Sequence, residues 1–249
     1  MFAKSEIKYY KRLFEQITTG SFSFTTSKAG PYEVKLVGGG AGSGAFDAKY
    51  YGGWSNWTFA CGGSGAYFHG IIALEANTTY TVNVGAGGAA ARPNGVSGAG
   101  GNTYIAQGEN IIISANGGGG AQCAAYLGAA YTGQGGTLNL GNSVVEVYTA
   151  LNGNNGPYGV KTTSQYAMSV YDGTSTGYGA SGYGWADGDD HAGAGAGVGG
   201  FAQVISLLDA IESDASSYDY TTKELSIFVP VLKNKSSQLT PYLLFNHKS

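Results

Sequence analysis

The sequence predicts a mainly β protein: an antiparallel β-sandwich that carries polyglycine-type helices, with one short α-helix at its N-terminus. Three observations lead to this fold class. Glycine makes up 44 of the 249 residues, about two and a half times its usual share of about 7%. Short apolar segments with a period of two separate the glycine runs, as β-strands would. Only one segment has the three- and four-residue spacing of an amphipathic helix.

The glycine runs recur through the middle of the chain, at 38–44, 62–65, 85–88, 117–120 and 193–200. Because glycine has no Cβ, two backbones can approach until their N–H and C=O groups meet. Extended helices with three residues per turn pack side by side in this way. The runs therefore predict an ordered scaffold of backbone that needs few large side chains.

The N-terminal residues 1–19 contain the one helical stripe. Its apolar residues are Ile7, Tyr10, Leu13, Phe14 and Ile17. Their spacing predicts an amphipathic helix that needs a partner for its apolar face. Two alternatives stay open: the helix packs on its own domain, or it makes an oligomerisation or attachment contact through these five residues.

Residues 20–207 form the predicted glycine-rich sandwich domain. Tyr32, Val34 and Leu36 alternate with polar residues, which places them on one face of a strand. Phe22 and Phe24 show the same alternation from Gly20 onward. The other predicted strands are 67–74, 79–84, 102–106, 111–115, 144–149, 165–171 and 202–207. Many short strands separated by turn residues favour an antiparallel sandwich.

The composition changes after Leu207, where glycine disappears and charged residues return. Residues 208–249 are therefore predicted to be a separate C-terminal segment that docks on this domain or on a neighbouring chain. A helical turn is expected at 206–211. Cys61 and Cys123 have no CxxC spacing, and either a single bridge or two buried thiols would fit them, with free thiols favoured.

The charge and hydropathy of the chain argue against several functional classes. The net charge is -3 and no basic cluster occurs, whereas binding to nucleic acid needs convergent Lys or Arg. No run approaches the roughly 18 apolar residues of a membrane span. The N-terminus carries charges in place of the apolar core of a signal peptide. We therefore expect no nucleic-acid partner, no membrane insertion and no ordinary export.

Catalytic and cofactor patterns are weak. His69, His191 and His247 stand in separate regions with no GxSxG turn. Residues 40–45 match a dinucleotide-binding GxGxxA turn, but no helix former follows. Asp187, Asp189 and Asp190 beside His191 are expected to form a solvated turn in preference to a cation site. The sequence thus predicts no enzyme, no catalytic residue, no cofactor and no metal.

Two aromatic loops are the candidate binding residues. Small residues separate their large rings, as in paratopes that present rigid aromatic side chains at low entropic cost. The rings belong to Tyr50, Tyr51, Trp54, Trp57, Phe59, Tyr178, Tyr183 and Trp185. The alternative is that these rings cover the edge of the glycine scaffold and bind no partner.

The ordered phrases of the middle region resemble a known family. The segment 62–74 is followed by a strand that ends in a glycine block at 80–88, then by a Gly-Gly-Asn-Thr turn at 100–103 and a closing strand at 199–205. This order is similar to the glycine-rich domain of bacteriophage tail-fibre and related virion proteins, over residues 20–207. The glycine-rich extracellular domain of anaplastic lymphoma kinase-type receptors is also similar.

The resemblance implies a non-enzymatic virion protein that is assembled in the host cytoplasm and becomes extracellular on release. Its expected role is that of a tail-fibre or receptor-binding component that presents aromatic loops to a host surface glycan or outer-surface protein. Other virion proteins and further copies of the chain are the expected partners. The alternative is a structural or capsid-decoration protein that makes subunit contacts without binding a receptor.

Overall fold

The fold consists of strands, extended glycine segments and turns. The computed structural model describes residues 8–46, 58–91, 95–123, 130–160, 165–186, 192–212, 217–219 and 224–226, and this part of the chain contains no helix. The longer strands are β1 (Lys8–Gln16), β2 (Gly20–Thr25), β3 (Gly30–Val37), β6 (Tyr67–Leu74), β7 (Thr79–Val84), β8 (Thr103–Gln107), β9 (Asn110–Ala115), β13 (Val144–Leu151) and β17 (Phe201–Glu212). The short strands are β4 (Gly44–Phe46), β5 (Thr58–Ala60), β10 (Gln122–Cys123), β11 (Ala130–Tyr131), β12 (Leu138–Leu140), β14 (Tyr158–Val160), β15 (Gly184–Ala186), β16 (Ala192–Ala194), β18 (Ser217–Asp219) and β19 (Glu224–Ser226).

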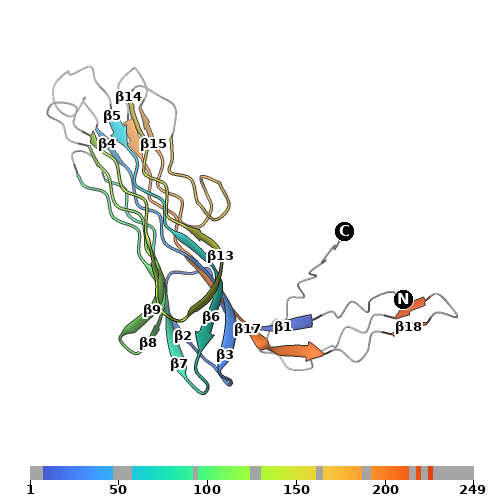
Figure 1. The fold of residues 1–249 in the computed structure, drawn as a ribbon. Coiled ribbons are helices and arrows are strands. Elements are labelled where there is room, and N and C mark those ends of the chain that lie inside the picture. Colours follow the sequence, from blue (N-terminus) through green and yellow to red (C-terminus); the bar gives the residue numbers. More distant parts are fainter. Residues whose placement is uncertain are drawn as a thin grey trace, which may run out of the picture.

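The predicted antiparallel sandwich is confirmed. One five-stranded sheet has the order β1-β17-β3-β6-β13, and the other has the order β12-β9-β8-β7-β2. The two sheets lie at one end of the molecule (Figure 1). The prediction of a strand at 165–171 is wrong. Only Gln165 forms an isolated bridge, with Gly184, and Ser169 instead closes a turn by accepting from the amide of Gly173.

A compact apolar core fills the space between the sheets. Tyr32, Val34 and Leu36 of β3 are buried on one face, as their alternation predicted, and Phe68 and Ile72 of β6 lie beside them. The opposite sheet contributes Tyr80, Val82, Val84, Ile105 and Ile113. Burial of one such side chain stabilises a fold by about 1.5–3 kcal/mol. This cluster therefore supplies the main hydrophobic stabilisation of the sandwich.

The predicted N-terminal helix is wrong, because residues 8–16 form strand β1 and pair with β17. The register shifts between Arg12 and Phe14, so Leu13 is an extra residue in the ladder. Both Leu13 and Phe14 pack against the core. This bulge interrupts the two-residue period of the strand, so the adjacent residues Leu13 and Phe14 both lie on the face of β1 that meets the core. The resulting spacing imitates a helical stripe in the sequence.

The five residues of that stripe consequently have different surroundings. Leu13 and Phe14 are half-buried against the sandwich core, whereas Ile17 is 58% exposed. Tyr10 lies in β1, and Ile7 is outside the described residues. Strand β17 also crosses the predicted boundary at 207 and continues to Glu212, so the helical turn expected at 206–211 is likewise absent.

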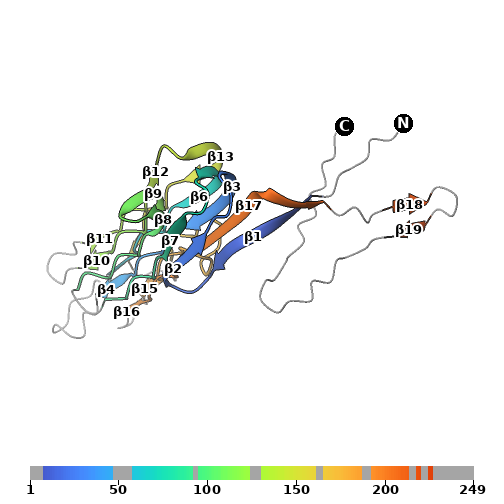
Figure 2. The same ribbon diagram turned by 90° about the horizontal axis from the view of Figure 1, so that it is seen from below.

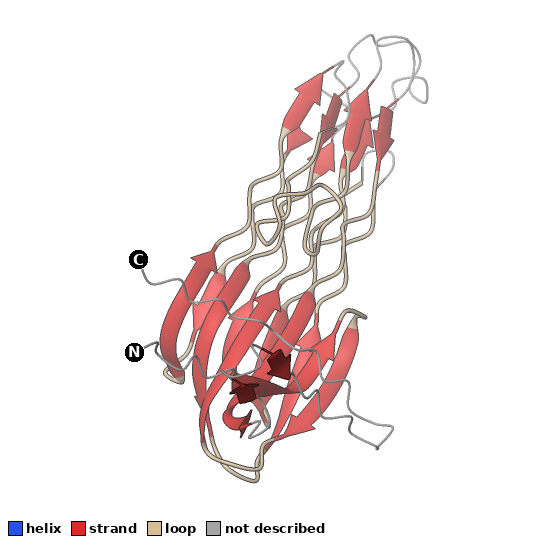
Figure 3. Cartoon of the chain, turned by 90° about the vertical axis from the view of Figure 1, so that its right-hand side faces the viewer, coloured by secondary structure: helices blue, strands red, loops and turns tan. Residues whose placement is uncertain are grey.

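The predicted polyglycine-type helices form a bundle that extends from the sandwich. We define the glycine bundle as residues 38–43, 61–66, 85–91, 97–102, 116–121, 133–137, 152–157, 179–184 and 195–200. These segments appear as tan lines running side by side between the sandwich and the small strands (Figure 3). Their amides and carbonyls bond to neighbouring segments and not within a segment.

Segment 38–43 lies at the centre of the glycine bundle and shows its three-residue period. Gly38 and Ala41 both donate to segment 61–66, at 2.9 and 3.0 Å. The residues that follow these two, at positions 39 and 42, donate to segment 97–102. The residues after those, at positions 40 and 43, donate to segment 195–200. Segments 85–91, 116–121 and 179–184 donate to its carbonyls. Three residues per turn is the repeat of a polyglycine helix, and it points successive amides at different neighbours.

Close backbone contact explains why the bundle needs glycine. A Cβ built on Gly40 would lie 1.9 Å from the carbonyl oxygen of Ala180. Gly40 also donates to Val198 and accepts from Gly88, at 2.8 and 2.9 Å. A side chain at this position would push apart segments that are held by buried hydrogen bonds. The glycine is therefore required by the approach of a neighbouring segment.

Buried serines complete the hydrogen bonding of the bundle. The Ser97 hydroxyl donates to the carbonyl of Gly42 at 2.6 Å and accepts from the amide of Ala121 at 2.8 Å. The Ser64 hydroxyl accepts from the amide of Asn154 at 2.7 Å. A buried backbone group without a partner costs about 1–3 kcal/mol. Serine is small enough to fit between segments and to supply that partner.

Candidate functional site

The candidate site is the end of the glycine bundle that lies away from the sandwich. Strands β14, β5 and β4 form a three-stranded sheet there, and β15 pairs with β16 while β10 pairs with β11. Figures 1 and 2 show these short strands gathered at one end. We call this group of seven short strands the distal tip. Residues 47–57, which include most of the first predicted loop, connect β4 to β5 at the distal tip. The second predicted loop, 178–185, includes bundle segment 179–184 and reaches the distal tip only where β15 begins at Gly184.

Phe59 holds the distal tip together and is not available to a ligand. It is fully buried in β5, whose neighbours are β4 and β14 in the sheet and β15 across from it. A Cβ on Gly184 would lie 2.4 Å from the Phe59 ring, so the ring packs directly on the backbone of β15. Of the two roles left open by the sequence, Phe59 has the structural one.

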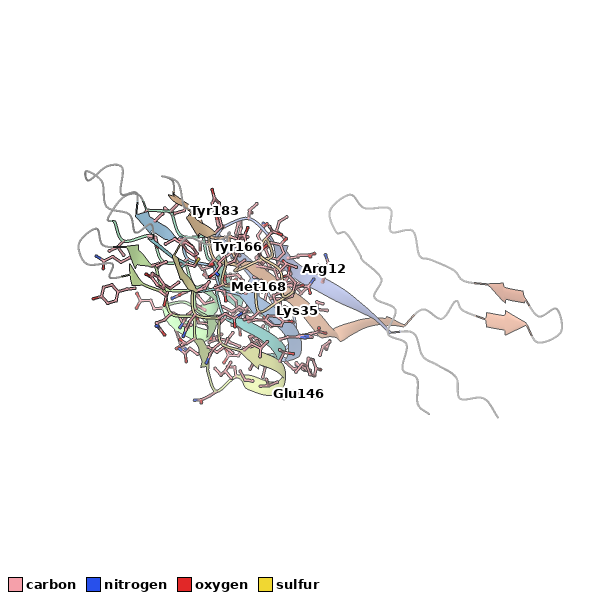
Figure 4. The ribbon with its side chains drawn as sticks, turned by 90° about the horizontal axis from the view of Figure 1, so that it is seen from above. Arg12, Lys35, Glu146, Tyr166, Met168 and Tyr183 are labelled. Atoms are coloured by element: carbon pink, nitrogen blue, oxygen red, sulfur yellow. The ribbon has the colours of Figure 1, made fainter. Side chains whose placement is uncertain are left out.

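Three exposed tyrosines lie in or next to the described strands of the distal tip. Tyr131 of β11 is 65% exposed, Tyr158 of β14 is 44% exposed, and Tyr183, which precedes β15, is 39% exposed. Tyr183 lies on the bundle side of the molecule, away from Arg12 of β1 (Figure 4). Its ring also covers Gly195, where a Cβ would lie 2.3 Å from the ring. The sequence analysis included Tyr183 among the candidate binding residues but missed Tyr131 and Tyr158. Each of these two lies two residues from a bundle glycine in the sequence.

Of the remaining predicted binding residues, only Tyr178 has a side chain within the described part of the chain, and it lies away from these tyrosines. Tyr178 is half-buried and stacks on Phe201 with a centroid distance of 5.3 Å, at the junction of the bundle and the sandwich. The backbone of Trp185 lies in β15. Tyr50, Tyr51, Trp54 and Trp57 are outside the described residues.

The comparison with protein families fits this architecture. A family model described as a glycine-rich domain matches residues 17–216. The chain belongs to this family. The match includes the bundle, the distal tip and every strand of the two sheets except β1, which ends at Gln16. No curated protein matches the chain.

Among the described residues of the bundle in this glycine-rich domain, Cys61 is the one buried ionisable group. It is a free thiol, and its Sγ lies 3.3 Å from the carbonyl oxygen of Gln165. Burial raises the pKa of Cys61 from its usual 9.0 to about 11, against the opposing effect of hydrogen bonds with Ser43 and Gly184. The thiol therefore stays protonated at neutral pH and has the surroundings of a small core residue. The side chain of Cys123 is outside the described ones.

Metal ligation and membrane crossing have no described candidates in the glycine-rich domain. The described residues hold no group of three or more His, Cys, Asp or Glu side chains that could bind an ion together. The acidic cluster at 187–191 is outside those residues. Among the residues described, no helix has the length and apolar character that a membrane span requires. The GxGxxA segment at 40–45 enters β4 from the bundle, and its first amide is already bonded to Val198.

Proposed function

We propose that this glycine-rich domain is a non-enzymatic bacteriophage virion protein that binds the host surface through its distal tip. The observation that supports this role most strongly is the position of exposed Tyr131 and Tyr158 at the far end of a hydrogen-bonded bundle. A rigid aromatic surface gives up little conformational entropy when it binds a partner. The resemblance of residues 20–207 to the domain in tail-fibre proteins supports the same role.

The two ends of the molecule would then have different tasks. The sandwich end carries β1 and β17, which run together beyond the body of the sandwich (Figure 2). A two-stranded ribbon is marginally stable by itself in water, so its outer part requires a partner. We propose that this ribbon attaches the protein to other virion proteins or to further copies of the chain, while the distal tip faces the host.

A blocking experiment tests the binding role. The purified chain is added to host cells before the phage that encodes it, and the rate of phage adsorption is measured. The wild-type chain should slow adsorption, and a Tyr131→Ala, Tyr158→Ala double variant should lose most of this effect. Ile111→Ala removes a 45% exposed side chain from β9 of the sandwich and serves as the matched control. Equal blocking by the wild-type and tyrosine variants would refute binding through these two residues.

The second candidate is a structural or decoration protein without a receptor. The protruding β1 and β17 ribbon favours it, because that feature requires a subunit partner but no host ligand. This candidate predicts a stable oligomer of the full chain by light scattering, together with no effect of the chain on adsorption. Gold-labelled antibody on intact particles would place the chain on the fibre or on the capsid.

A further inference from the structure

A second surface with binding chemistry lies far from the distal tip, on the outer face of the sheet β1-β17-β3-β6-β13. Four aromatic rings are in contact there. Tyr148 of β13 meets His69 of β6 at 5.0 Å in an edge-to-face arrangement. His69 stacks on Tyr67 at 6.5 Å, and Tyr67 meets Tyr171 edge to face at 5.1 Å. We call these rings, together with Glu33, the lateral patch.

The inner members of the lateral patch hold the outer members in place. Tyr67 is only 8% exposed and packs with Phe201, which is 5% exposed. Tyr171 is half-buried and lies 5.9 Å from the Phe201 ring. Tyr148, in contrast, is 48% exposed at the edge of the sheet. The patch is thus an exposed ring on a fixed aromatic base, and a ligand would order few side chains on binding.

Polar groups lie beside these rings. The Nε2 atom of His69 is 2.8 Å from Oε1 of Glu33, and the two side chains are 23% and 25% exposed. Lys35 is directly opposite His69 in the pairing of β3 with β6. Lys35 and Glu146, from β3 and β13 of this sheet, are labelled in Figure 4. A carboxylate and an imidazole therefore lie beside the rings, and a lysine occupies the paired position on the neighbouring strand.

We propose that the lateral patch binds a neutral sugar residue of a surface polysaccharide. The weakly positive C–H face of a pyranose ring matches the negative face of an aromatic ring such as Tyr148. Sugar hydroxyls both donate and accept, so they suit the carboxylate of Glu33 and the charged donor of Lys35. A few convergent polar groups beside aromatic rings are the usual composition of small-ligand sites. This site is separate from the distal tip, and only the choice of a bacterial surface polysaccharide as its ligand rests on the proposed function.

The chemistry of the lateral patch disfavours a nucleic acid. Single-stranded nucleic acids also stack on aromatic rings, but their affinity depends on a positively charged groove. The patch places Glu33 beside its central His69, and the whole chain has a net charge of -3. A phosphate chain passing Tyr148 would meet this carboxylate. A neutral sugar has no such repulsion.

The test uses the full chain on an array of neutral oligosaccharides and bacterial surface polysaccharides, with an oligothymidine as the nucleic-acid probe. We expect binding to at least one glycan. Tyr148→Ala should raise the dissociation constant for that glycan at least tenfold, whereas Tyr148→Phe should change it by no more than about threefold because the ring remains. Glu33→Gln should raise the dissociation constant by about the same factor as Tyr148→Ala. Circular dichroism of each variant confirms that the fold is retained.

The distal-tip variant Tyr131→Ala, Tyr158→Ala separates this site from the proposed function. If glycan binding survives in that variant and falls in Tyr148→Ala, the lateral patch is the site. If binding falls only in the distal-tip variant, the inference is wrong and the proposed function stands. Binding of the oligothymidine alone, or of no glycan at all, would also overturn the inference.

Discussion

Two adjacent glycines of one bundle segment offer a direct test of backbone-to-backbone packing. A Cβ on Gly118 would lie 2.0 Å from the carbonyl oxygen of Gly63, whereas the nearest atom to a Cβ on Gly119 is the amide nitrogen of Gln134 at 3.3 Å. Alanine at either position restricts the unfolded chain equally, by about 0.4–1 kcal/mol. A difference in stability between Gly118→Ala and Gly119→Ala therefore reports the packing alone.

The structure gives the size of that difference. Real Cβ contacts do not fall below 3.0 Å, so the Gly63 carbonyl would have to move by about 1 Å in Gly118→Ala. That carbonyl accepts from Ala41 of the central segment, and Gly118 itself donates to Gly39, both at 3.0 Å. Overpacking costs about 1–3 kcal/mol, and each weakened buried hydrogen bond costs about 1 kcal/mol. We expect Gly118→Ala to be less stable than Gly119→Ala by about 3 kcal/mol.

Urea denaturation followed by tyrosine and tryptophan fluorescence measures the free energy of unfolding of both variants. Gly119→Ala should stay within about 1 kcal/mol of the wild type, because its neighbour needs to give by only a few tenths of an ångström. A change in midpoint with an unchanged slope would show that stability alone is affected. If the two variants unfold at the same urea concentration, the bundle is not held by close backbone contact, and the requirement for glycine has been misjudged.

Other predictions concern the N-terminal strand and the response to alkaline pH. Phe14→Ala should lower the free energy of unfolding by about 2 kcal/mol, because the Phe14 ring packs on the rings of Phe22 and Phe24 with centroid distances of 6.1 Å. Ile17→Ala, at a 58% exposed position, should change the free energy of unfolding by less than about 0.5 kcal/mol. Equal effects of the two substitutions would place β1 outside the core. Burial raises the pKa of Cys61 to about 11, and burial with the neighbouring Tyr171 and Glu33 raises the pKa of Tyr67 to about 12. The folded state then holds these protons more tightly than the unfolded chain, so stability should fall as the pH rises above about 9. In Cys61→Ala the fall should begin only above about pH 10, where Tyr67 of the unfolded chain starts to lose its proton while the folded chain keeps it. An unchanged onset would contradict the assigned pKa of Cys61. Cys61 should also react with iodoacetamide at pH 8 far more slowly in the folded protein than in urea, and fast labelling of the folded protein would show that the thiol is accessible.

The sequence and the structure agree best where a residue's immediate neighbours decide its conformation. The alternation of Tyr32, Val34 and Leu36 predicted β3 and its buried face, and the glycine runs predicted the bundle. The candidate site was less predictable. Phe59 and Tyr183 both lie in glycine-rich surroundings in the sequence, yet one is buried under β15 and the other is exposed. The partner that covers Phe59 is more than a hundred residues away, so no local pattern could identify it.

The sequence by itself determined that this protein is built from short strands and close-packed glycine backbone, because alternation and the absence of Cβ atoms are properties of each segment. Only the tertiary structure decided what surrounds each segment. Residues 8–16 form strand β1 despite their helical spacing, because pairing with β17 outweighs local helix propensity, and the bulge at Leu13 accommodates that spacing. The tertiary structure also decided which neighbouring segment each amide of the bundle bonds to. It brought Glu33, His69 and Tyr148 together from three strands. Contacts of this kind depend on the register between distant segments, which one segment's sequence does not contain.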